Sequence, residues 1–170
     1  MKDKLLSKQG WVILLICIIS FFINNRVVVP DIMEARNMVT AREMVHDGNW
    51  LVPTMNGDLR LEKPPLPTWL TAVAEMISPD NLALQRAMAG FAAILLVAFF
   101  YLTAVQVMRN KRYAFISTIL LCTCYNIILM GRTASWDIYC HAFMMGAIYF
   151  LIRAFAAKAC SWKDFTWAGV

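Results

Sequence analysis

The chain has 170 residues, of which 60% are hydrophobic and 16% are charged, and its mean hydropathy is +0.57. A charged fraction so far below the roughly 25% of soluble domains, at a length with too little interior to bury the apolar side chains, argues against a soluble protein. The aliphatic and aromatic content excludes a disordered chain, so the composition predicts an all-α membrane protein with about four spans and one substantial loop.

Four apolar stretches are long enough to be transmembrane helices. They cover residues 11–29, 87–108, 113–131 and 134–152, and residues 30–86 form a long loop between the first and the second. Each is near the ~20 residues that cross a ~30 Å hydrocarbon layer. A basic segment precedes the first stretch, but no small-residue cleavage pattern follows it, which indicates an uncleaved anchor.

The distribution of Lys and Arg predicts which side of the membrane each connecting segment occupies. With the N-terminus inside, segments 1–10, 109–112 and 153–164 carry a net charge of +7, and the outer segments carry −2. The overall charge of +5 therefore indicates topology, and no nucleic-acid partner is expected. None of the five cysteines lies in the outer loop, so no disulfide is expected there.

The first helix of the outer loop is predicted over residues 31–46, lying in the plane of the membrane surface. Asp31 and Glu34 have the spacing of a capping box at its start, and Gly48 follows its end. Residues three apart on a helix point the same way, so these two carboxylates are expected to share a face. Such a pair can hold a metal or act as a general base, and a helix cap beside a solvated acid is the alternative.

The rest of the outer loop holds a turn, a proline-rich run and a second short helix. Asn56-Gly57 predicts a tight turn. Three prolines between residues 64 and 67 are expected to prevent helix formation until Thr68, and the helix then runs to Ile77. Lys63, beside these prolines, is a candidate phosphate ligand, and an ordinary surface lysine is the alternative.

Asp137 stands at the outer edge of the last predicted span. An ionisable group there is costly unless it has a partner or reaches water. His141 lies one turn further on, so an Asp137–His141 hydrogen bond is expected, and a helix cap is the alternative. Arg132 is placed to neutralise Asp137 or to bind phosphate. The predicted topology brings five candidate residues to one side of the membrane at similar depth: Asp31, Glu34, Lys63, Arg132 and Asp137.

Several motifs of the loop resemble those of a known family. They are Glu34–Arg36, Ala41–Met44, Gly48–Gly57 and Glu62–Trp69. Together they resemble the first periplasmic loop of the lipid A aminoarabinose transferases. They also resemble the wider polyprenyl-phosphate-sugar glycosyltransferases of the GT-C fold, which include the protein O-mannosyltransferases. The segment 132–137 is similar to the second acidic site of that family, at the start of its fourth span.

The resemblance implies a multi-pass enzyme of the bacterial inner membrane, with a cytoplasmic N-terminus and its site on the periplasmic face. Such enzymes move a sugar from a polyprenyl-phosphate donor to a lipid or protein acceptor. By resemblance, the catalytic carboxylates are Asp31, Glu34 and Asp137, and the residues that bind the donor phosphate are Lys63, Arg36 and Arg132. Glu62 is the candidate ligand if a divalent metal ion is the cofactor.

The chain departs from the family pattern at two positions. Relatives open this loop with adjacent Asp and Glu, whereas Met33 precedes Glu34 here, and Asn37 stands where they commonly have Tyr. Either Asp31 or Glu34 is therefore the candidate base. Relatives are much longer, so residues 1–170 are expected to be the N-terminal portion of a larger GT-C bundle. The alternative functions are a small multi-span transporter, which the absence of charge at the midplane of the membrane disfavours, and a membrane assembly protein without catalysis.

Overall fold

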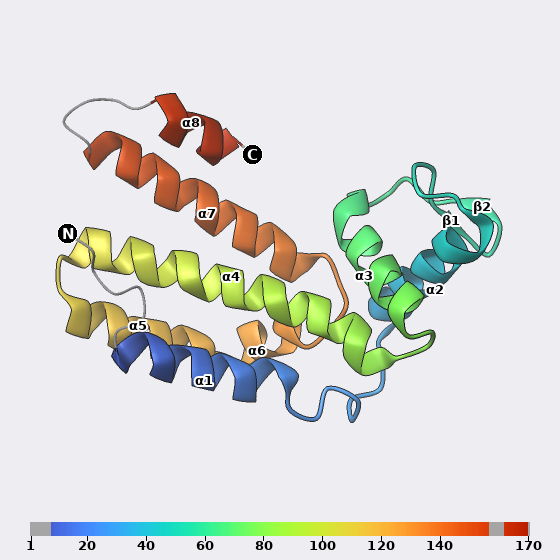
Figure 1. Ribbon diagram of the computed structural model, residues 1–170, viewed down its shortest axis with the longest axis horizontal. Coiled ribbons are helices and arrows are strands. Elements are labelled where there is room, and N and C mark those ends of the chain that lie inside the picture. The colour runs from blue at the N-terminus through green and yellow to red at the C-terminus, as the bar shows by residue number, and fades with distance from the viewer. Residues whose placement is uncertain (1–7, 157–161, 170) are drawn as a thin grey trace.

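The computed structural model describes residues 8–156 and 162–169, and nearly all regular structure in them is helical (Figure 1). In chain order the elements are α1 (Lys8–Phe22), α2 (Ile32–Asp47), β1 (Thr54–Met55), β2 (Asp58–Leu59), α3 (Pro65–Ile77), α4 (Leu82–Met108), α5 (Lys111–Cys122), α6 (Tyr125–Gly131), α7 (Asp137–Ala156) and α8 (Trp162–Gly169). The predicted helical character is confirmed, with one short antiparallel hairpin added.

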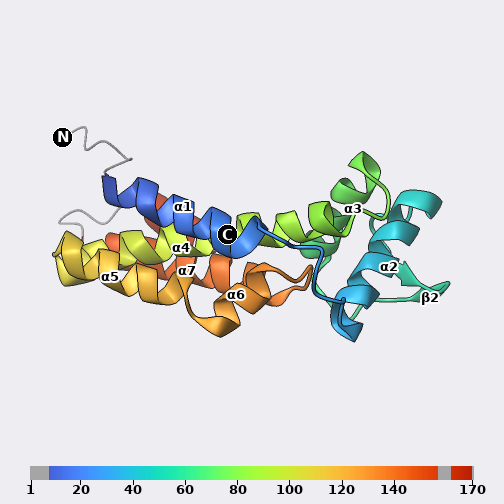
Figure 2. The same cartoon turned by 90° about the horizontal axis from the view of Figure 1, so that it is seen from below.

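Helices α1, α4, α5 and α7 lie side by side, and taken in chain order each runs opposite to the one before it (Figure 1). Helix α4 is central, because it contacts α1, α5, α6 and α7. The unit formed by α2, the hairpin and α3 lies beyond one end of this bundle, as the second view also shows (Figure 2). The segment between α6 and α7 is at the same end. The alternation therefore places two segments far apart in sequence, 30–81 and 132–136, next to each other.

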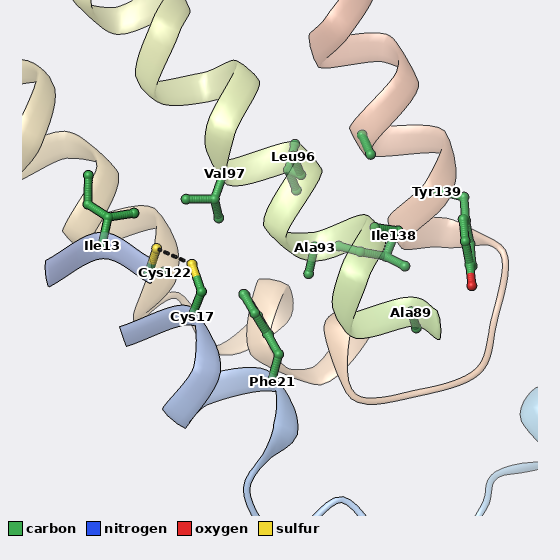
Figure 3. Close-up of a cluster of buried hydrophobic side chains, with 12 residues drawn as sticks. Ile13, Cys17, Phe21, Ala89, Ala93, Leu96, Val97, Cys122, Ile138 and Tyr139 are labelled. Carbon is green, nitrogen blue, oxygen red and sulfur yellow. Dashed lines mark hydrogen bonds between the residues drawn. The ribbon is translucent and has the colours of Figure 1, made fainter. Parts of the chain in front are cut away.

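A cluster of apolar side chains holds the bundle together (Figure 3). Phe21 of α1, Val97 of α4 and Ile138 of α7 are among its fully buried members. The sulfur atoms of Cys17 and Cys122 meet within it at 3.9 Å and join α1 to α5. The cluster also buries the small residues Ala89, Ala93 and Ala142, and small residues let the backbones of membrane helices approach closely.

Within residues 8–156 and 162–169, two single helices, α4 and α7, are long and apolar enough to cross a membrane. They correspond to the predicted spans 87–108 and 134–152, although α4 starts earlier, at Leu82, and α7 starts later, at Asp137. The predicted span 113–131 is not one straight helix, because α5 and α6 meet at a bend of 64°. Between them lie Thr123 and Cys124, which carry no glycine or proline signal for a break.

The first predicted span is also shorter than expected. Helix α1 has 15 described residues and ends at Phe22, and residues 23–28 form turns and bends. Asn24 has a left-handed φ of +56° directly after the helix. The extension of the span to residue 29 is therefore wrong, because the polar run Asn24-Asn25-Arg26 ends the helix and the following valines lie exposed outside it.

The outer-loop helix α2 has the predicted caps. Asp31 is its N-cap and accepts a hydrogen bond from the backbone N–H of Glu34 at 2.7 Å. Gly48, at φ +74°, ends the helix in the left-handed conformation that glycine adopts without steric cost. Asp31 is exposed and Glu34 is fully buried, so the two carboxylates have different surroundings. The helix cap of the alternative is therefore present, whereas Glu34 is not a solvated acid, and a joint role of the two carboxylates in metal binding or catalysis stays a prediction.

The remainder of the loop matches its prediction at the turn and differs at the prolines. Asn56 and Gly57 both have positive φ and connect β1 to β2, so the predicted tight turn is confirmed. Helix α3 begins at Pro65 instead of Thr68. Proline is well tolerated in the first turn of a helix, where its missing N–H would have no partner in the helix anyway.

Some sequence predictions concern residues outside the described ranges. They include the basic residues Lys2, Lys4 and Lys158, part of the predicted inner charge, and Cys160. The direction in which the bundle crosses the membrane stays a prediction.

Candidate functional site

The deepest charged contact joins the outer loop to the bundle. Glu34 of α2 is 0% exposed and Arg86 of α4 is 1% exposed. The two side chains form a bidentate ion pair. Arg86 Nε and Nη2 each donate to a Glu34 carboxylate oxygen at 2.7 Å. A second branch of the guanidinium donates to the backbone carbonyls of Asn25 and Val28. Arg86 therefore fastens α2 and the α1–α2 connection to the N-terminal part of α4.

The same glutamate also holds the segment that precedes α7. Glu34 Oε1 accepts a hydrogen bond from the backbone N–H of Ala134 at 2.8 Å. Asn37, one turn further along α2, donates to the Ala134 carbonyl at 2.7 Å, and its own oxygen accepts from Thr68. With three donors on a wholly buried carboxylate, the geometry gives Glu34 a positioning role for the 132–136 segment. Its assignment as a base stays a prediction, and Asp31 is the exposed candidate of the two.

A second cluster forms around the indole ring of Trp136. The Arg60 guanidinium carbon lies 5.1 Å from the ring centroid, and the Lys63 ammonium nitrogen lies 5.5 Å from it. These are cation–π distances. Arg60 is anchored by hydrogen bonds from Nη1 to the Arg36 carbonyl and to Thr40 Oγ1. The cluster brings the predicted phosphate ligand Lys63 against the residue directly before Asp137.

Arg60 is mostly withdrawn from solvent, at 7% exposure. Burial lowers the pKa of its guanidinium and the nearby charge of Arg36 acts in the same direction, while Glu62 opposes them. Arginine stays charged despite such shifts, because its reference pKa exceeds 12. The Trp136 cluster is therefore cationic.

Arg36 and Glu62 line a hollow of about 190 Å³ beside the hairpin, together with Arg60 and Asp58. Two guanidinium groups facing two carboxylates make this surface mixed in charge. No group of three or more His, Cys, Asp or Glu side chains with metal-binding proximity occurs in residues 8–156 and 162–169. The donors around Glu62 do not by themselves make a metal site, and its role as a ligand stays a prediction.

The predicted residues of the 132–141 segment have separate surroundings. Asp137 is exposed at the first residue of α7. His141 Nδ1 pairs with the backbone carbonyl of Asp137 at 2.6 Å, so the expected hydrogen bond between the two side chains is not the one formed. Arg132 donates to the backbone carbonyl of Ile23 at the end of α1, and its role in binding phosphate stays a prediction.

Four residues of these clusters are absent from the sequence-based candidates: Asn37, Arg60, Arg86 and Trp136. Arg86 carries a recognisable signal, since it is an ionisable group at the edge of an apolar run, as Asp137 is. The other three gain their roles only from contacts with distant parts of the chain.

Comparison with known proteins gives concordant results. The family model for dolichyl-phosphate-mannose-protein mannosyltransferase matches residues 11–170. The chain is 34% identical over 92 residues to the undecaprenyl phosphate-alpha-4-amino-4-deoxy-L-arabinose arabinosyl transferase of Pseudomonas savastanoi, covering 54% of this chain and 17% of that protein. It is 31% identical over 108 residues to the enzyme of that name from Shewanella sediminis, covering 64% of this chain and 19% of the relative.

A solved structure shares the fold. The crystal structure of ArnT from Cupriavidus metallidurans bound to undecaprenyl phosphate superposes with a TM-score of 0.74 at 19% identity, covering 94% of this chain and 30% of that one. The described helices therefore have the arrangement found in part of a GT-C bundle. The chain spans less than a fifth of the length of the two arabinosyl transferases.

Proposed function

Because this chain belongs to the dolichyl-phosphate-mannose-protein mannosyltransferase family, we propose that it takes part in transferring a sugar from a polyprenyl phosphate to a lipid or protein acceptor on the outer face of the bacterial inner membrane. The names of its relatives specify undecaprenyl phosphate and an aminoarabinose, and the structurally similar ArnT was crystallised with undecaprenyl phosphate. These names support a polyprenyl-phosphate donor.

The proposed transfer needs a cation for the leaving group. As the acceptor oxygen forms its bond to the anomeric carbon, the bond between that carbon and the phosphate oxygen breaks, and negative charge develops on the phosphate. Lys63 is exposed beside a rigid proline run and has its ammonium against Trp136, so it is placed to stabilise this charge. Arg36 of α2 is also exposed and supplies a second cation.

The transfer also needs a carboxylate for the acceptor. Asp137 is exposed and follows Trp136 directly, which makes it the candidate that orients the acceptor or takes the proton of an acceptor hydroxyl. Asp31 is the second exposed carboxylate, although it also caps α2. Glu34 acts indirectly, by holding the backbone of the segment that leads into Asp137.

The observation that carries this proposal is the convergence of Lys63 on Trp136, the residue before Asp137, in a chain of this family. It is tested by sugar transfer from a radiolabelled polyprenyl-phosphate sugar in membranes that contain the protein. Lys63→Ala and Asp137→Asn should each lower transfer at least a hundredfold. Lys111→Ala, an exposed lysine at the start of α5, is the matched control and should leave it unchanged. Full transfer by Asp31→Asn, Glu34→Gln and Asp137→Asn alike would remove the carboxylates from the mechanism.

A further inference from the structure

A small pocket lies beneath the Trp136 cluster. Its volume is about 10 Å³, and its lining includes Arg60, Lys63 and Trp136 together with Thr40 and Thr68. A space of this size holds about one water molecule or one oxygen atom of a larger group. Because the pocket is open on one side, the remainder of such a group can stay outside.

Trp136, which lines this pocket, carries a donor without an acceptor in the part of the chain that the structure describes. Trp136 is only 5% exposed, and its indole Nε1 has no hydrogen-bond partner among the described residues. A buried N–H without a partner is unusual in native structures and costs free energy comparable to that of a lost hydrogen bond. Trp69, in the neighbouring helix α3, shows the ordinary arrangement, since its Nε1 donates to the Trp50 carbonyl at 2.7 Å.

The charge around this N–H is positive. Arg60 and Lys63 both lie against the Trp136 ring, and none of the residues that line the pocket is acidic. The two hydroxyl groups are already committed as donors elsewhere, Thr40 to the Arg36 carbonyl and Thr68 to Asn37. Among the described residues, Arg60 makes its hydrogen bonds through Nη1, which leaves Nε and Nη2 as further donors. The missing component is therefore an acceptor that carries negative charge.

We propose that this pocket receives one oxygen of a phosphate group, with the Trp136 N–H donating to it and Arg60 and Lys63 balancing its charge. Arg60 and Trp136 are then phosphate-binding residues in addition to Lys63. Identifying this phosphate as that of the lipid-linked donor rests on the proposed function, whereas the pocket chemistry applies equally to inorganic phosphate. Because the pocket has room for about one oxygen atom, the phosphorus of such a group would stay outside it.

The test is NMR of the protein in lipid nanodiscs with ¹⁵N-labelled tryptophan, the Trp136 indole signal being assigned with Trp136→Phe. The sample is titrated in separate arms with undecaprenyl phosphate, with undecaprenol and with inorganic phosphate. We expect the Trp136 indole proton to move downfield with undecaprenyl phosphate and not with undecaprenol. A shift with inorganic phosphate as well supports the pocket for phosphate in general. Equal shifts with undecaprenol, or no shift in any arm, refute the proposal. The pocket would then hold a water molecule instead of a phosphate oxygen.

Variants give an independent readout. Arg60→Gln and Trp136→Phe should each weaken undecaprenyl phosphate binding about tenfold or more, since each removes a donor to a charged acceptor. Arg60→Lys should weaken binding less than Arg60→Gln does, because lysine keeps the positive charge. The matched controls are Arg42→Gln, an exposed arginine of α2, and Trp69→Phe, whose N–H is already paired; both should bind normally. If Trp136→Phe does not fold, the loss of undecaprenyl phosphate binding in Arg60→Gln, measured against Arg42→Gln, still decides.

The outcome separates the pocket from the proposed function. If phosphate binding depends on Arg60 and Trp136 but the protein has no transfer activity, the proposed phosphate pocket stands and the proposed sugar transfer is refuted. If sugar transfer is unchanged in Arg60→Gln and Trp136→Phe and the indole signal does not shift, the proposed phosphate pocket is refuted and the proposed sugar transfer stands.

Discussion

Replacing Glu34 with glutamine should cost much more stability than its small chemical change implies. The carboxylate accepts two hydrogen bonds from Arg86 at 2.7 Å and one from the Ala134 N–H at 2.8 Å. Glutamine keeps the shape but leaves the Arg86 charge buried without a counter-charge, and an amide N–H₂ group faces one of the three donors. Breaking a buried pair in this way costs about 3–5 kcal/mol. At about 1.4 kcal/mol per tenfold, the folding equilibrium falls by roughly a hundredfold to several thousandfold.

The measurement is unfolding of the purified protein in mixed micelles, followed by circular dichroism as the fraction of denaturing detergent rises. Asp58→Asn, an exposed carboxylate of the hairpin, is the control and should stay within about 0.5 kcal/mol of wild type. The double variant Glu34→Gln/Arg86→Gln should be less destabilised than the sum of the single variants, with a coupling of about 1–3 kcal/mol. A Glu34→Gln protein as stable as the control, or a coupling near zero, would refute the reasoning.

Three further predictions concern the bundle and the caps of α2. A mild oxidant should join Cys17 to Cys122, whose sulfurs lie 3.9 Å apart; thiols that both remain open to alkylation afterwards would contradict the packing of α1 on α5. Gly48→Ala should destabilise the fold by about 1–2 kcal/mol through its φ of +74° alone, since nothing lies within 4 Å of the added Cβ, and an unchanged unfolding midpoint would contradict the left-handed cap. The hydrogen bond to Asp47 raises the pKa of His46 above its usual value, so NMR titration should show this shift and Asp47→Asn should abolish it. Because the folded-state pKa is the higher one, any resulting stabilisation is complete below about pH 6.5 and disappears as the pH rises through the folded-state value.

The features that the sequence predicted well are local ones. The cap at Asp31, the end of α2 at Gly48 and the turn at Asn56-Gly57 each depend on a few neighbouring residues, and each is present in the structure. Helix ends and turns of this kind follow from side-chain and backbone preferences that short sequence windows contain.

The features that the sequence did not predict depend on distant contacts. From the sequence, Glu34 is predicted to be a solvated or catalytic acid. In the structure it is paired with Arg86, which lies 52 positions later in the chain. Arg60 carries no motif and gains its place from the ring of Trp136. No glycine or proline lies at the break between α5 and α6. A prediction from hydropathy therefore treats the two helices as one span.

The contacts of Glu34 join segments of the chain that are synthesised at different times. The chain emerges from its N-terminus, yet this carboxylate is satisfied by Arg86, 52 residues later, and by Ala134, 100 residues later. Helix α2 therefore cannot complete its packing until α4 has been made, and it reaches its final partners only after α5 and α6. Until then the Glu34 carboxylate lacks these partners. A nascent chain arrested before residue 86 should hold this loop open to protease, and one extended past residue 134 should protect it.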